Sequence, residues 1–372
     1  MRILQLTSHL NVGGIASSVL SLASALSGRG HDVVIASGGG QFERVLGERN
    51  LAHWPATLNT SVEFGPSVAG AVRELGRRLR AEPVDVLHAH TRVGQVAAAR
   101  LARRAGVPYV ATWHGVYQRN LGRVLWPCTG DMTIAISEPV RQHLIHTFGV
   151  PERRIRLIPH GIDPSPFLEP VPEAERMRLR EALRLPAGVP VVGTVSRLVA
   201  VKGVDRLVRA LPGIRARVPD AHALVVGDGP DRVRLGKLAE ELGVADAVRF
   251  AGTMSETAPA LSLMDACVFL PGPEEGFGLV LLEAMASGRP IVALRGGGAS
   301  WVLSESPVGL VFDADDLAGM TAGVIRLLRS PAEARALGQG AQAIVTDRYS
   351  LTRMAEHVEG VYRELVESGA RA

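Results

Sequence analysis

The sequence predicts an α/β protein of two domains, each built on a parallel β-sheet. The chain has 372 residues, of which 47% are hydrophobic and 21% are charged, a balance typical of a globular protein of about two domains. Short apolar runs alternate with amphipathic helical stretches along the chain, as in parallel sheets covered by helices. A stretch with six prolines, 164–190, interrupts this alternation and should connect the two domains.

Six strands are expected in each half of the chain. In the first half they are expected at 3–6, 33–36, 86–88, 109–112, 132–136 and 155–158. In the second half they are expected at 191–195, 223–226, 248–251, 266–270, 291–293 and 309–311, before a final helix at 351–367. The first domain is therefore placed at 1–165 and completed by the C-terminal helix within 351–372, with a linker region at 166–187 and a second domain at 188–350.

Several classes of protein are not expected. No apolar run approaches the length of a membrane span, about 18 residues, and Met1 leads directly into a strand, which leaves no room for a signal peptide. We therefore expect a cytoplasmic protein, with peripheral attachment to the inner face of the cell membrane as an option. Cys128 and Cys267 lie far apart in apolar surroundings, a pattern that supports neither a disulfide framework nor a zinc site.

The positive charge is concentrated in the first half of the chain. The whole chain carries a formal charge of +4, whereas residues 1–165 carry 18 Arg against 11 Asp and Glu, a balance of +7. Arginines on the expected helices could meet an anionic membrane or a phosphorylated acceptor, or form a solvated exterior. Nucleic acid is not expected as a partner, because aromatic content is only 4% and no basic–aromatic pattern occurs. The arginines are Arg73, Arg77, Arg78, Arg80, Arg100, Arg103 and Arg104.

The segment from Glu275 to Glu283 is the strongest candidate for a ligand site. Pro271 disfavours a helix before Glu275, while the apolar run that follows favours one, so the glycines should lie at a helix start. Free amide groups there suit a diphosphate or sugar hydroxyls. Glu283 lies within an otherwise apolar helix and needs a polar partner. The alternative to a ligand site is an ordinary helix, in which Glu275 lies at the solvated N-terminus and Glu283 pairs with a core arginine. The residues of the segment are Glu275, Gly276, Phe277, Gly278, Leu279 and Glu283.

Arg197 and Lys202 are the second candidate. They follow the first expected strand of the second domain and lie on either side of a short loop before a helix. A planar guanidinium and a compact ammonium together suit a diphosphate leaving group. Lys202 is one of two lysines in a chain with 39 arginines, which favours a specific role over the alternative of two solvated cations.

Glycines and histidines mark the first domain. Gly13 and Gly14 follow the first strand, where backbone can approach a phosphate, but Gly28 and Gly30 lie after the helix and do not complete a dinucleotide fingerprint. His88 and His90 share one face of a strand, and packing or hydrogen bonding is expected for them rather than a metal. His114 ends the next strand beside Gly115, a position suited to a ligand.

A paired-aspartate metal site is not expected. Asp313 and Asp315 have the spacing of a metal-binding D-x-D motif, but with Asp316 they directly precede the apolar segment 317–328. Aspartate is favoured at a helix N-terminus. We therefore interpret these residues as a helix cap.

Over nearly its whole length the chain resembles retaining glycosyltransferases of family 4 in the GT-B class. The resemblance implies two facing Rossmann-like domains with a deep cleft between them, acceptor recognition by the first and nucleotide-sugar binding by the second. Its motifs are the glycines 13–14, Thr-x-His-Gly at 112–115, the segment 158–163, Ser196-Arg197-Leu198 with 202–205, Gly-Asp-Gly-Pro at 227–230, and Glu275-x₇-Glu283 with 284–288.

The resemblance also implies residue roles. Arg197 and Lys202 would neutralise the donor diphosphate with the amide of Gly14, and Glu283 would accept the ribose hydroxyls. Glu275 and the amides of Phe277 and Gly278 would hold the sugar, and His114 would position it. The leaving diphosphate would assist deprotonation of the acceptor, so that neither a protein nucleophile nor a metal is required.

Two departures from the family pattern occur. Ala299-Ser300-Trp301 follow Gly296-Gly297-Gly298 where a glutamate is common, and His160 stands where asparagine is usual. The predicted function is metal-independent, retaining transfer of a hexose-type sugar from a nucleoside diphosphate to a glycan, glycolipid or other cell-surface or secondary-metabolite acceptor. The alternatives are a sugar-nucleotide epimerase, which would need acid and base groups such as Asp131 and Glu138, and a catalytically silent sugar-nucleotide-binding protein.

Overall fold

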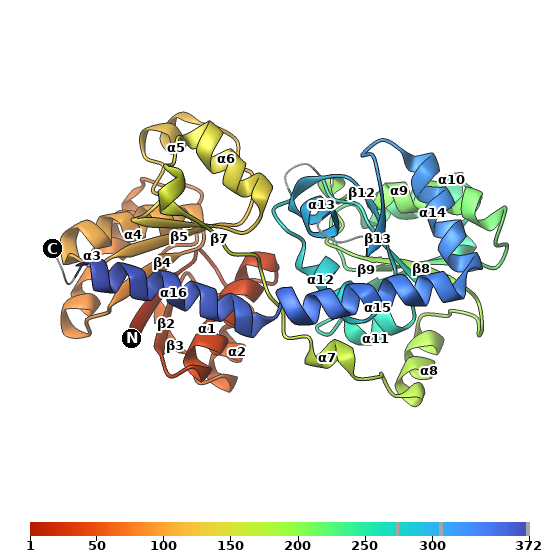
Figure 1. Ribbon diagram of the computed structural model, residues 1–372, viewed down its shortest axis with the longest axis horizontal. Coiled ribbons are helices and arrows are strands. Elements are labelled where there is room, and N and C mark those ends of the chain that lie inside the picture. The colour runs from red at the N-terminus through yellow and green to blue at the C-terminus, as the bar shows by residue number, and fades with distance from the viewer. Residues whose placement is uncertain (273–274, 305–307, 370–372) are drawn as a thin grey trace. The chain divides into compact units, whose positions relative to one another are not determined.

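The computed structural model describes residues 1–272, 275–304 and 308–369, and the chain forms two compact units (Figure 1). The first unit consists of Met1–Gly161 together with the chain from Leu351 onward, and the second is Ile162–Ser350. The first unit thus ends four residues before the boundary drawn from the sequence at 165. The stretch expected as a linker, 166–187, belongs to the second unit and overlaps α7 (Ser165–Leu168) and α8 (Glu173–Ala182).

The first unit contains a parallel sheet of seven strands in the order β3-β2-β1-β4-β5-β6-β7. All six strands expected in this half are confirmed. The sequence analysis missed β3, whose four residues include a proline; it lies at the sheet edge, where a residue without an amide hydrogen is tolerated. The strands are β1 (Arg2–Leu6), β2 (Asp32–Ser37), β3 (Ala52–Pro55), β4 (Val86–Ala89), β5 (Tyr109–Trp113), β6 (Met132–Ala135) and β7 (Ile155–Leu157).

Helices from both ends of the chain cover this sheet. The last helix, α16, lies beside α1 (Figure 1), and Val358 and Tyr362 of α16 join Ile3 and Val86 of the strands in one apolar core. The Arg29 Nε at the end of α1 donates to Glu359 of α16 at 2.6 Å. The helices are α1 (Gly14–Gly28), α2 (Glu43–Glu48), α3 (Pro66–Ala81), α4 (Arg92–Ala105), α5 (Leu121–Leu125), α6 (Glu138–Phe148) and α16 (Leu351–Gly369).

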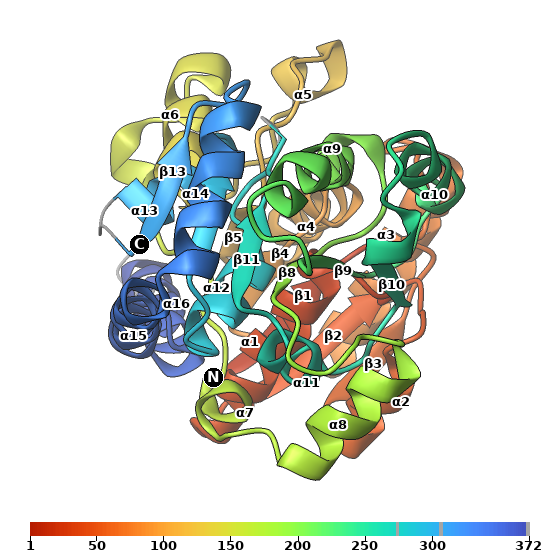
Figure 2. The same cartoon turned by 90° about the vertical axis from the view of Figure 1, so that its right-hand side faces the viewer.

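The second unit contains a parallel sheet of six strands in the order β10-β9-β8-β11-β12-β13, and all six expected strands are confirmed. They are β8 (Val191–Val195), β9 (His222–Val226), β10 (Val248–Gly252), β11 (Ala266–Phe269), β12 (Ile291–Leu294) and β13 (Gly309–Phe312). Besides α7 and α8, the helices are α9 (Val204–Arg215), α10 (Arg232–Glu241), α11 (Ala258–Ser262), α12 (Leu279–Ala286), α13 (Gly297–Ser304), α14 (Leu317–Arg329) and α15 (Pro331–Arg348). Figure 2 shows α8 at the edge of this unit, where it packs against α11.

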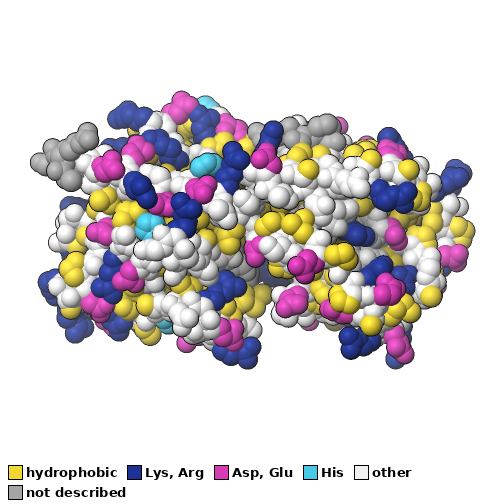
Figure 3. Space-filling model, turned by 60° about the horizontal axis from the view of Figure 1, so that its bottom comes forward, with side chains coloured by type: hydrophobic (Ala, Val, Ile, Leu, Met, Phe, Trp, Pro, Cys, Tyr) yellow, Lys and Arg dark blue, Asp and Glu magenta, His cyan; other side chains and the backbone are white. Residues whose placement is uncertain are grey.

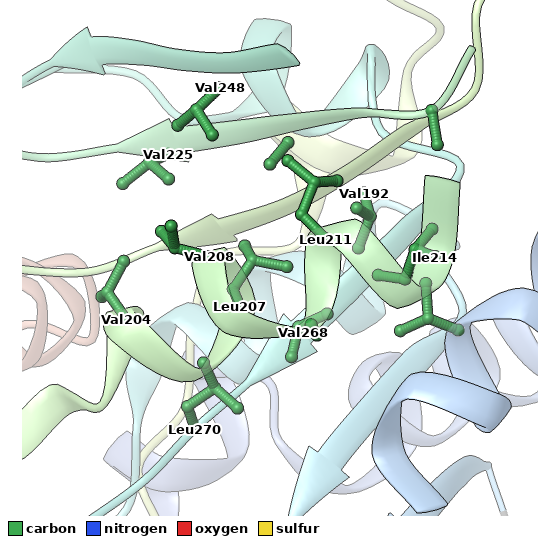
Figure 4. Close-up of a cluster of buried hydrophobic side chains, with 14 of the residues drawn as sticks. Val192, Val204, Leu207, Val208, Leu211, Ile214, Val225, Val248, Val268 and Leu270 are labelled. Atoms are coloured by element: carbon green, nitrogen blue, oxygen red, sulfur yellow. The ribbon is translucent and has the colours of Figure 1, made fainter. Parts of the chain in front are cut away.

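The core of the second unit lies between α9 and the sheet. Leu207 and Leu211 of α9 point toward Val192, Val225 and Val268 on three neighbouring strands (Figure 4). All five side chains are almost fully buried. Because strands of such sheets are covered on both faces, they are apolar throughout, which is why short apolar runs predicted them.

Both sheets have Rossmann-like strand order, with the first strand in the middle and the fourth beside it. The chain changes direction between β1 and β4 in the first unit and between β8 and β11 in the second. Open α/β sheets bind ligands at the carboxyl ends of the strands at this switch point. No helix in the described chain is both long and apolar enough to span a membrane.

Candidate active site

The switch point of the second unit brings together two residues that are 73 positions apart. The loop after β8 carries Lys202, and the loop after the neighbouring strand β11 carries Glu275; their ammonium and carboxylate form an ion pair. The Lys202 side chain is 30% exposed and that of Glu275 is 16% exposed. Gly203, at φ 61°, follows Lys202, and a Cβ there would lie 3.2 Å from the carbonyl oxygen of Leu270. A glycine therefore lets the two loops approach closely.

Arg197 is exposed on the same loop after β8. Among the residues that the structure describes, no side chain or backbone group forms a hydrogen bond or ion pair with the Arg197 guanidinium. The backbone of this loop is held by the Gly-Asp-Gly-Pro motif, since the Leu198 amide donates to the Asp228 carbonyl at 2.9 Å. A Cβ at Gly227 would lie 2.0 Å from the Ser196 carbonyl oxygen, so only glycine fits. The motif thus supports the loop that presents Arg197.

The predicted helix start after Gly278 is confirmed. α12 begins at Leu279, and Gly278 precedes it at φ 85°, where a Cβ would lie 2.5 Å from the ring of Phe269. Phe277 is 2% exposed and its ring meets that of Tyr349 edge-on, with centroids 6.0 Å apart. The buried ring anchors the turn. The Leu281 amide donates to the Gly278 carbonyl at 2.9 Å, whereas the amides before it precede the first intrahelical acceptor.

Glu283 lies on α12 and was expected to need a polar partner. The structure supplies Thr257, whose hydroxyl donates to the carboxylate at 2.7 Å. Burial raises the pKa of Glu283, and the Thr257 hydrogen bond partly opposes this effect. The alternative pairing of Glu283 with a core arginine is wrong, and Glu275 is ion-paired rather than simply solvated. The sequence carried no signal for Thr257, because it reaches Glu283 only through the packing of α11.

Gly13 and Gly14 lie where they were expected, at the start of α1, whereas Gly28 is the last residue of that helix and does not lie after it. α1 begins at Gly14, with Gly13 before it; both are exposed, and an added Cβ at either would meet no atom within 4 Å. At the other end, α1 includes Gly28, and Gly30 adopts φ 86° in the turn that follows. Gly14 lies in the first unit and Arg197 in the second, and their joint contact with one diphosphate stays a prediction.

His114 is part of a buried chain of hydrogen bonds in the first unit. Its Nδ1 lies 3.1 Å from Nε2 of His160, and its Nε2 lies 3.3 Å from Nδ1 of His90. The chain continues from His160 Nδ1 to the hydroxyl of Ser18 on α1, at 3.0 Å. The residue that departs from the family pattern, His160, is therefore a direct partner of His114.

Neighbouring His88 is held by packing and hydrogen bonds, as predicted. Its Nδ1 lies 2.5 Å from the Tyr362 hydroxyl and its Nε2 lies 2.7 Å from the Thr112 hydroxyl. In the described residues no group of three or more His, Cys, Asp or Glu side chains is placed to hold a metal ion. Asp316 caps α14 as predicted, because its carboxylate accepts from the Gly319 amide at 2.7 Å.

Burial keeps these rings neutral. It lowers the pKa of His88 to about 3 and that of His160 to about 4, with His114 adding to the effect at His88. Burial also lowers the pKa values of His114 and His90, and neighbouring histidines lower them further. A neutral imidazole has one donor and one acceptor nitrogen. The tautomer of His114 is therefore coupled to those of His90 and His160.

The acid–base pair that an epimerase would need is already engaged. Asp131 accepts from the Tyr109 amide at 2.9 Å, and Glu138 accepts from Arg141 and Gln142 at 2.7 and 2.5 Å. The two carboxylates therefore support local structure.

The Arg-rich helices of the first unit form a groove away from these residues. Its volume is about 630 Å³, and it lies between α3 and α4. Its floor includes Val72 and Leu101, and its arginines are Arg73, Arg77, Arg80 and Arg104. The helical placement of these arginines is as predicted.

Two family models match the chain: "Glycosyltransferase Family 4" over residues 12–166 and "Glycosyl transferases group 1" over residues 175–344. The GDP-mannose-dependent alpha-(1-6)-phosphatidylinositol monomannoside mannosyltransferase of Mycolicibacterium smegmatis is 36% identical over 283 residues, 70% of this chain and 72% of the relative. The D-inositol 3-phosphate glycosyltransferase of Acidothermus cellulolyticus is 30% identical over 95% of this chain and 86% of the relative.

Solved structures share the fold. A glycosyltransferase from Rickettsia africae aligns with a TM-score of 0.89 at 21% identity, covering 98% of each chain. Anabaena Alr3699/HepE in complex with UDP-glucose aligns with a TM-score of 0.84 at 24% identity, covering 98% of this chain and all of that chain. The fold is thus that of the GT-B glycosyltransferases. The chain belongs to the group 1, family 4 glycosyltransferases and is a transferase of glycosyl groups.

Proposed function

We propose that the protein is a metal-independent, retaining transferase that moves a hexose-type sugar from a nucleoside diphosphate to a glycan, glycolipid or related acceptor. The observation that carries this proposal is the Lys202–Glu275 ion pair at the switch point of the second unit. The Lys202 ammonium, which would bind the diphosphate, and the Glu275 carboxylate, which would bind the sugar, therefore lie next to each other in one site. An incoming donor would separate them, giving phosphate to Lys202 and sugar hydroxyls to Glu275.

The donor-binding residues follow from this placement. Arg197 has a free guanidinium for the diphosphate, and Glu283 offers a carboxylate, oriented by Thr257, to the ribose. HepE, a protein of the same fold, has been solved with UDP-glucose, and the M. smegmatis relative is GDP-mannose-dependent. The proposed donor-binding residues are Gly13, Gly14, Arg197, Lys202, Glu275, Gly276, Phe277, Gly278, Leu279 and Glu283, with His114, Glu275, Arg197 and Lys202 acting in catalysis.

Catalysis would rest on position and charge. Arg197 and Lys202 would stabilise the negative charge that develops on the leaving diphosphate, which is the task a metal ion performs in other transferases. His114 is held neutral, so it would not place a positive charge beside the anomeric carbon. Both of its ring nitrogens lie within hydrogen-bond distance of His90 and His160, so it would position the sugar only by exchanging the 3.3 Å contact with His90 for a sugar hydroxyl. The leaving diphosphate would take the proton of the acceptor hydroxyl on the same face, which retains the anomeric configuration.

In this proposal the first unit binds the acceptor. The groove lined by Arg73, Arg77, Arg80 and Arg104 favours an anionic partner, either a phosphorylated acceptor or a membrane surface. The names of relatives include a phosphatidylinositol monomannoside mannosyltransferase and a lipopolysaccharide core glycosyltransferase. We therefore favour a glycolipid acceptor at an anionic membrane.

A donor panel tests the proposal. The protein is mixed with UDP-, GDP-, ADP- and dTDP-sugars in EDTA, and thermal stability and nucleotide release are followed. A donor at about 100 times its Kd stabilises by about 2.7 kcal/mol, which raises the Tm of a unit of this size by roughly 5–11 °C. Lys202→Ala and Glu283→Ala should lose this shift, whereas Lys237→Ala, which alters the other lysine, should keep it.

Three outcomes would contradict parts of the proposal. A chain that responds to no donor would be a silent relative, and an unchanged shift in Lys202→Ala would remove the proposed phosphate site. Activity that requires an added divalent metal would contradict metal independence. A product with the inverted anomeric configuration, read from its NMR coupling constants, would contradict retention.

A further inference from the structure

Exposed apolar side chains gather at one place on the first unit. Among the described residues, six of the twelve exposed large hydrophobic side chains lie in two short segments, and Leu121 and Trp126 are 74% and 58% exposed. A cluster of this kind on a soluble domain marks an interaction site. We call it the Trp126 patch, and it consists of Val62, Phe64, Leu121, Val124, Leu125 and Trp126.

The two segments of the Trp126 patch are in contact. The rings of Phe64 and Trp126 lie with centroids 5.6 Å apart, and a Cβ at Gly122 would lie 3.5 Å from the Phe64 ring. Asn120 caps α5 by accepting from the Arg123 amide at 2.8 Å. The patch is therefore one continuous surface formed by α5, Trp126 and the segment 62–64.

Arg92 holds this surface in place from beneath. Its guanidinium donates to Glu63 at 2.8 Å, to the Pro127 carbonyl at 3.1 Å and to the Gly122 carbonyl at 3.2 Å. The Arg92 side chain is only 10% exposed. A buried arginine thus ties both segments together, so the apolar residues are presented outward by a supported backbone.

The charged side chains near the Trp126 patch are mostly arginines. Residues 115–130 contain Arg119 and Arg123 and no lysine, aspartate or glutamate, and Glu63 is paired with Arg92. Arg100 lies over the Phe64 ring at 5.7 Å, and Arg119 is exposed on the loop before α5. The face in Figure 3 differs, because acidic and basic side chains are interspersed there.

We infer that the Trp126 patch inserts into the headgroup region of an anionic phospholipid bilayer, with its arginines on the lipid phosphates. Tryptophan and leucine beside arginine is the composition of interfacial membrane segments, and the unbalanced positive charge matches an anionic bilayer. The inference rests on the membrane contact of the proposed function and assigns that contact to the Trp126 patch, a different surface from the arginine groove between α3 and α4. Insertion here would bring the first unit to a glycolipid acceptor.

Vesicle binding tests the inference. The full chain is sedimented with vesicles of phosphatidylcholine, with and without phosphatidylglycerol. Leu121→Ser/Leu125→Ser/Trp126→Ser should weaken binding to the phosphatidylglycerol vesicles by about tenfold or more. Val233→Ser is the matched control, because Val233 is 69% exposed on the second unit, and its binding should be unchanged. Arg119→Gln should weaken binding about fivefold.

Tryptophan fluorescence provides a second measurement, which detects insertion of Trp126 even when vesicle binding is unchanged. Trp54 and Trp113 are buried, and Trp301 is half-buried on α13 of the second unit, so vesicle-dependent changes in tryptophan emission should come mainly from the exposed Trp126. Brominated phospholipids should quench this emission, and Trp126→Phe should remove the quenching while vesicle binding remains.

The outcomes separate this inference from the proposed transfer reaction. The donor-dependent thermal shift should be the same in the triple variant as in the unaltered chain, which also shows that the variant is folded. Equal sedimentation of the triple variant and the unaltered chain would overturn the inference, as would no binding to phosphatidylglycerol vesicles. A dimer of the unaltered chain that becomes a monomer in the triple variant, without a change in vesicle binding, would assign the patch to a second copy and also overturn it.

Discussion

His114 shows how a single residue depends on neighbours that the sequence does not mark. Its position beside a glycine at the end of a strand suggested that it contacts a ligand. Its hydrogen-bond partners, His90 and His160, lie on other segments of the chain, and the sequence did not indicate them. The same holds for Glu283, whose carboxylate is oriented by Thr257 of a separate loop. At the residue scale, the sequence marked candidate functional side chains but not the residues that orient them.

The buried histidines predict a pH dependence of stability. Their pKa values are lower in the folded protein than the unfolded value of about 6.5, so the unfolded chain binds more protons as the pH falls below that value. The contribution of these rings to the free energy of unfolding should be nearly constant between pH 7.5 and 7 and should fall by about 1.4 kcal/mol per pH unit for each neutral ring below pH 6.5. Urea titrations between pH 7.5 and 5, followed by tryptophan fluorescence, measure this slope.

His160→Asn is the control for this pH dependence. It removes one of the neutral rings, so its slope below pH 6.5 should be shallower than that of the unaltered chain. An unfolding free energy that stays constant from pH 7.5 to 5 would contradict the neutral, buried state of the rings.

At the scale of elements, α12 and the turn before it were predictable because their signals are local. Glycine before an apolar run predicts a helix start, and the structure places that start at Leu279. The reason for the glycine is not local, because a Cβ at Gly278 would meet the ring of Phe269 on β11 at 2.5 Å. The strand β3 shows the opposite case, since a four-residue edge strand has too weak a pattern to be recognised.

Gly278→Ala should destabilise the second unit and weaken donor binding. A side chain at φ 85° is strained and would also push on Phe269, at a cost of about 1–3 kcal/mol. The matched change is Gly236→Ala on α10, where an added Cβ meets no atom within 4 Å, and it should stabilise by about 0.5–1 kcal/mol. Thermal unfolding and donor titration of both variants measure these effects, and equal stability of the two would contradict the argument.

At the scale of the whole molecule, the two units have separate apolar cores. The core of the first unit includes Tyr362 from the last helix, and the core of the second includes Leu211 from α9. A chain end that returns to the first unit is visible only in the tertiary structure. Each core should therefore respond to its own mutations.

Core truncations test this separation. Tyr362→Ala should destabilise the first unit by about 3–5 kcal/mol and Leu211→Ala the second by about 2–5 kcal/mol. Hydrogen exchange read by mass spectrometry should show lost protection in β1, β2 and β4 for the first variant and in β8, β9 and β11 for the second. Loss of protection in both units from either change would contradict the division.

The sequence by itself determined the α/β class, the two halves and twelve strands, and it marked candidate donor-binding residues whose role stays a prediction. These depend on patterns within a few neighbouring positions, where periodicity and glycine placement reflect burial directly. The tertiary structure alone decided the pairing of Lys202 with Glu275, the partners of Glu283 and His114, the return of α16 and the outward face of the Trp126 patch. Each of these joins residues that are distant in sequence, and sheet order and helix packing, rather than local pattern, determine which distant residues meet.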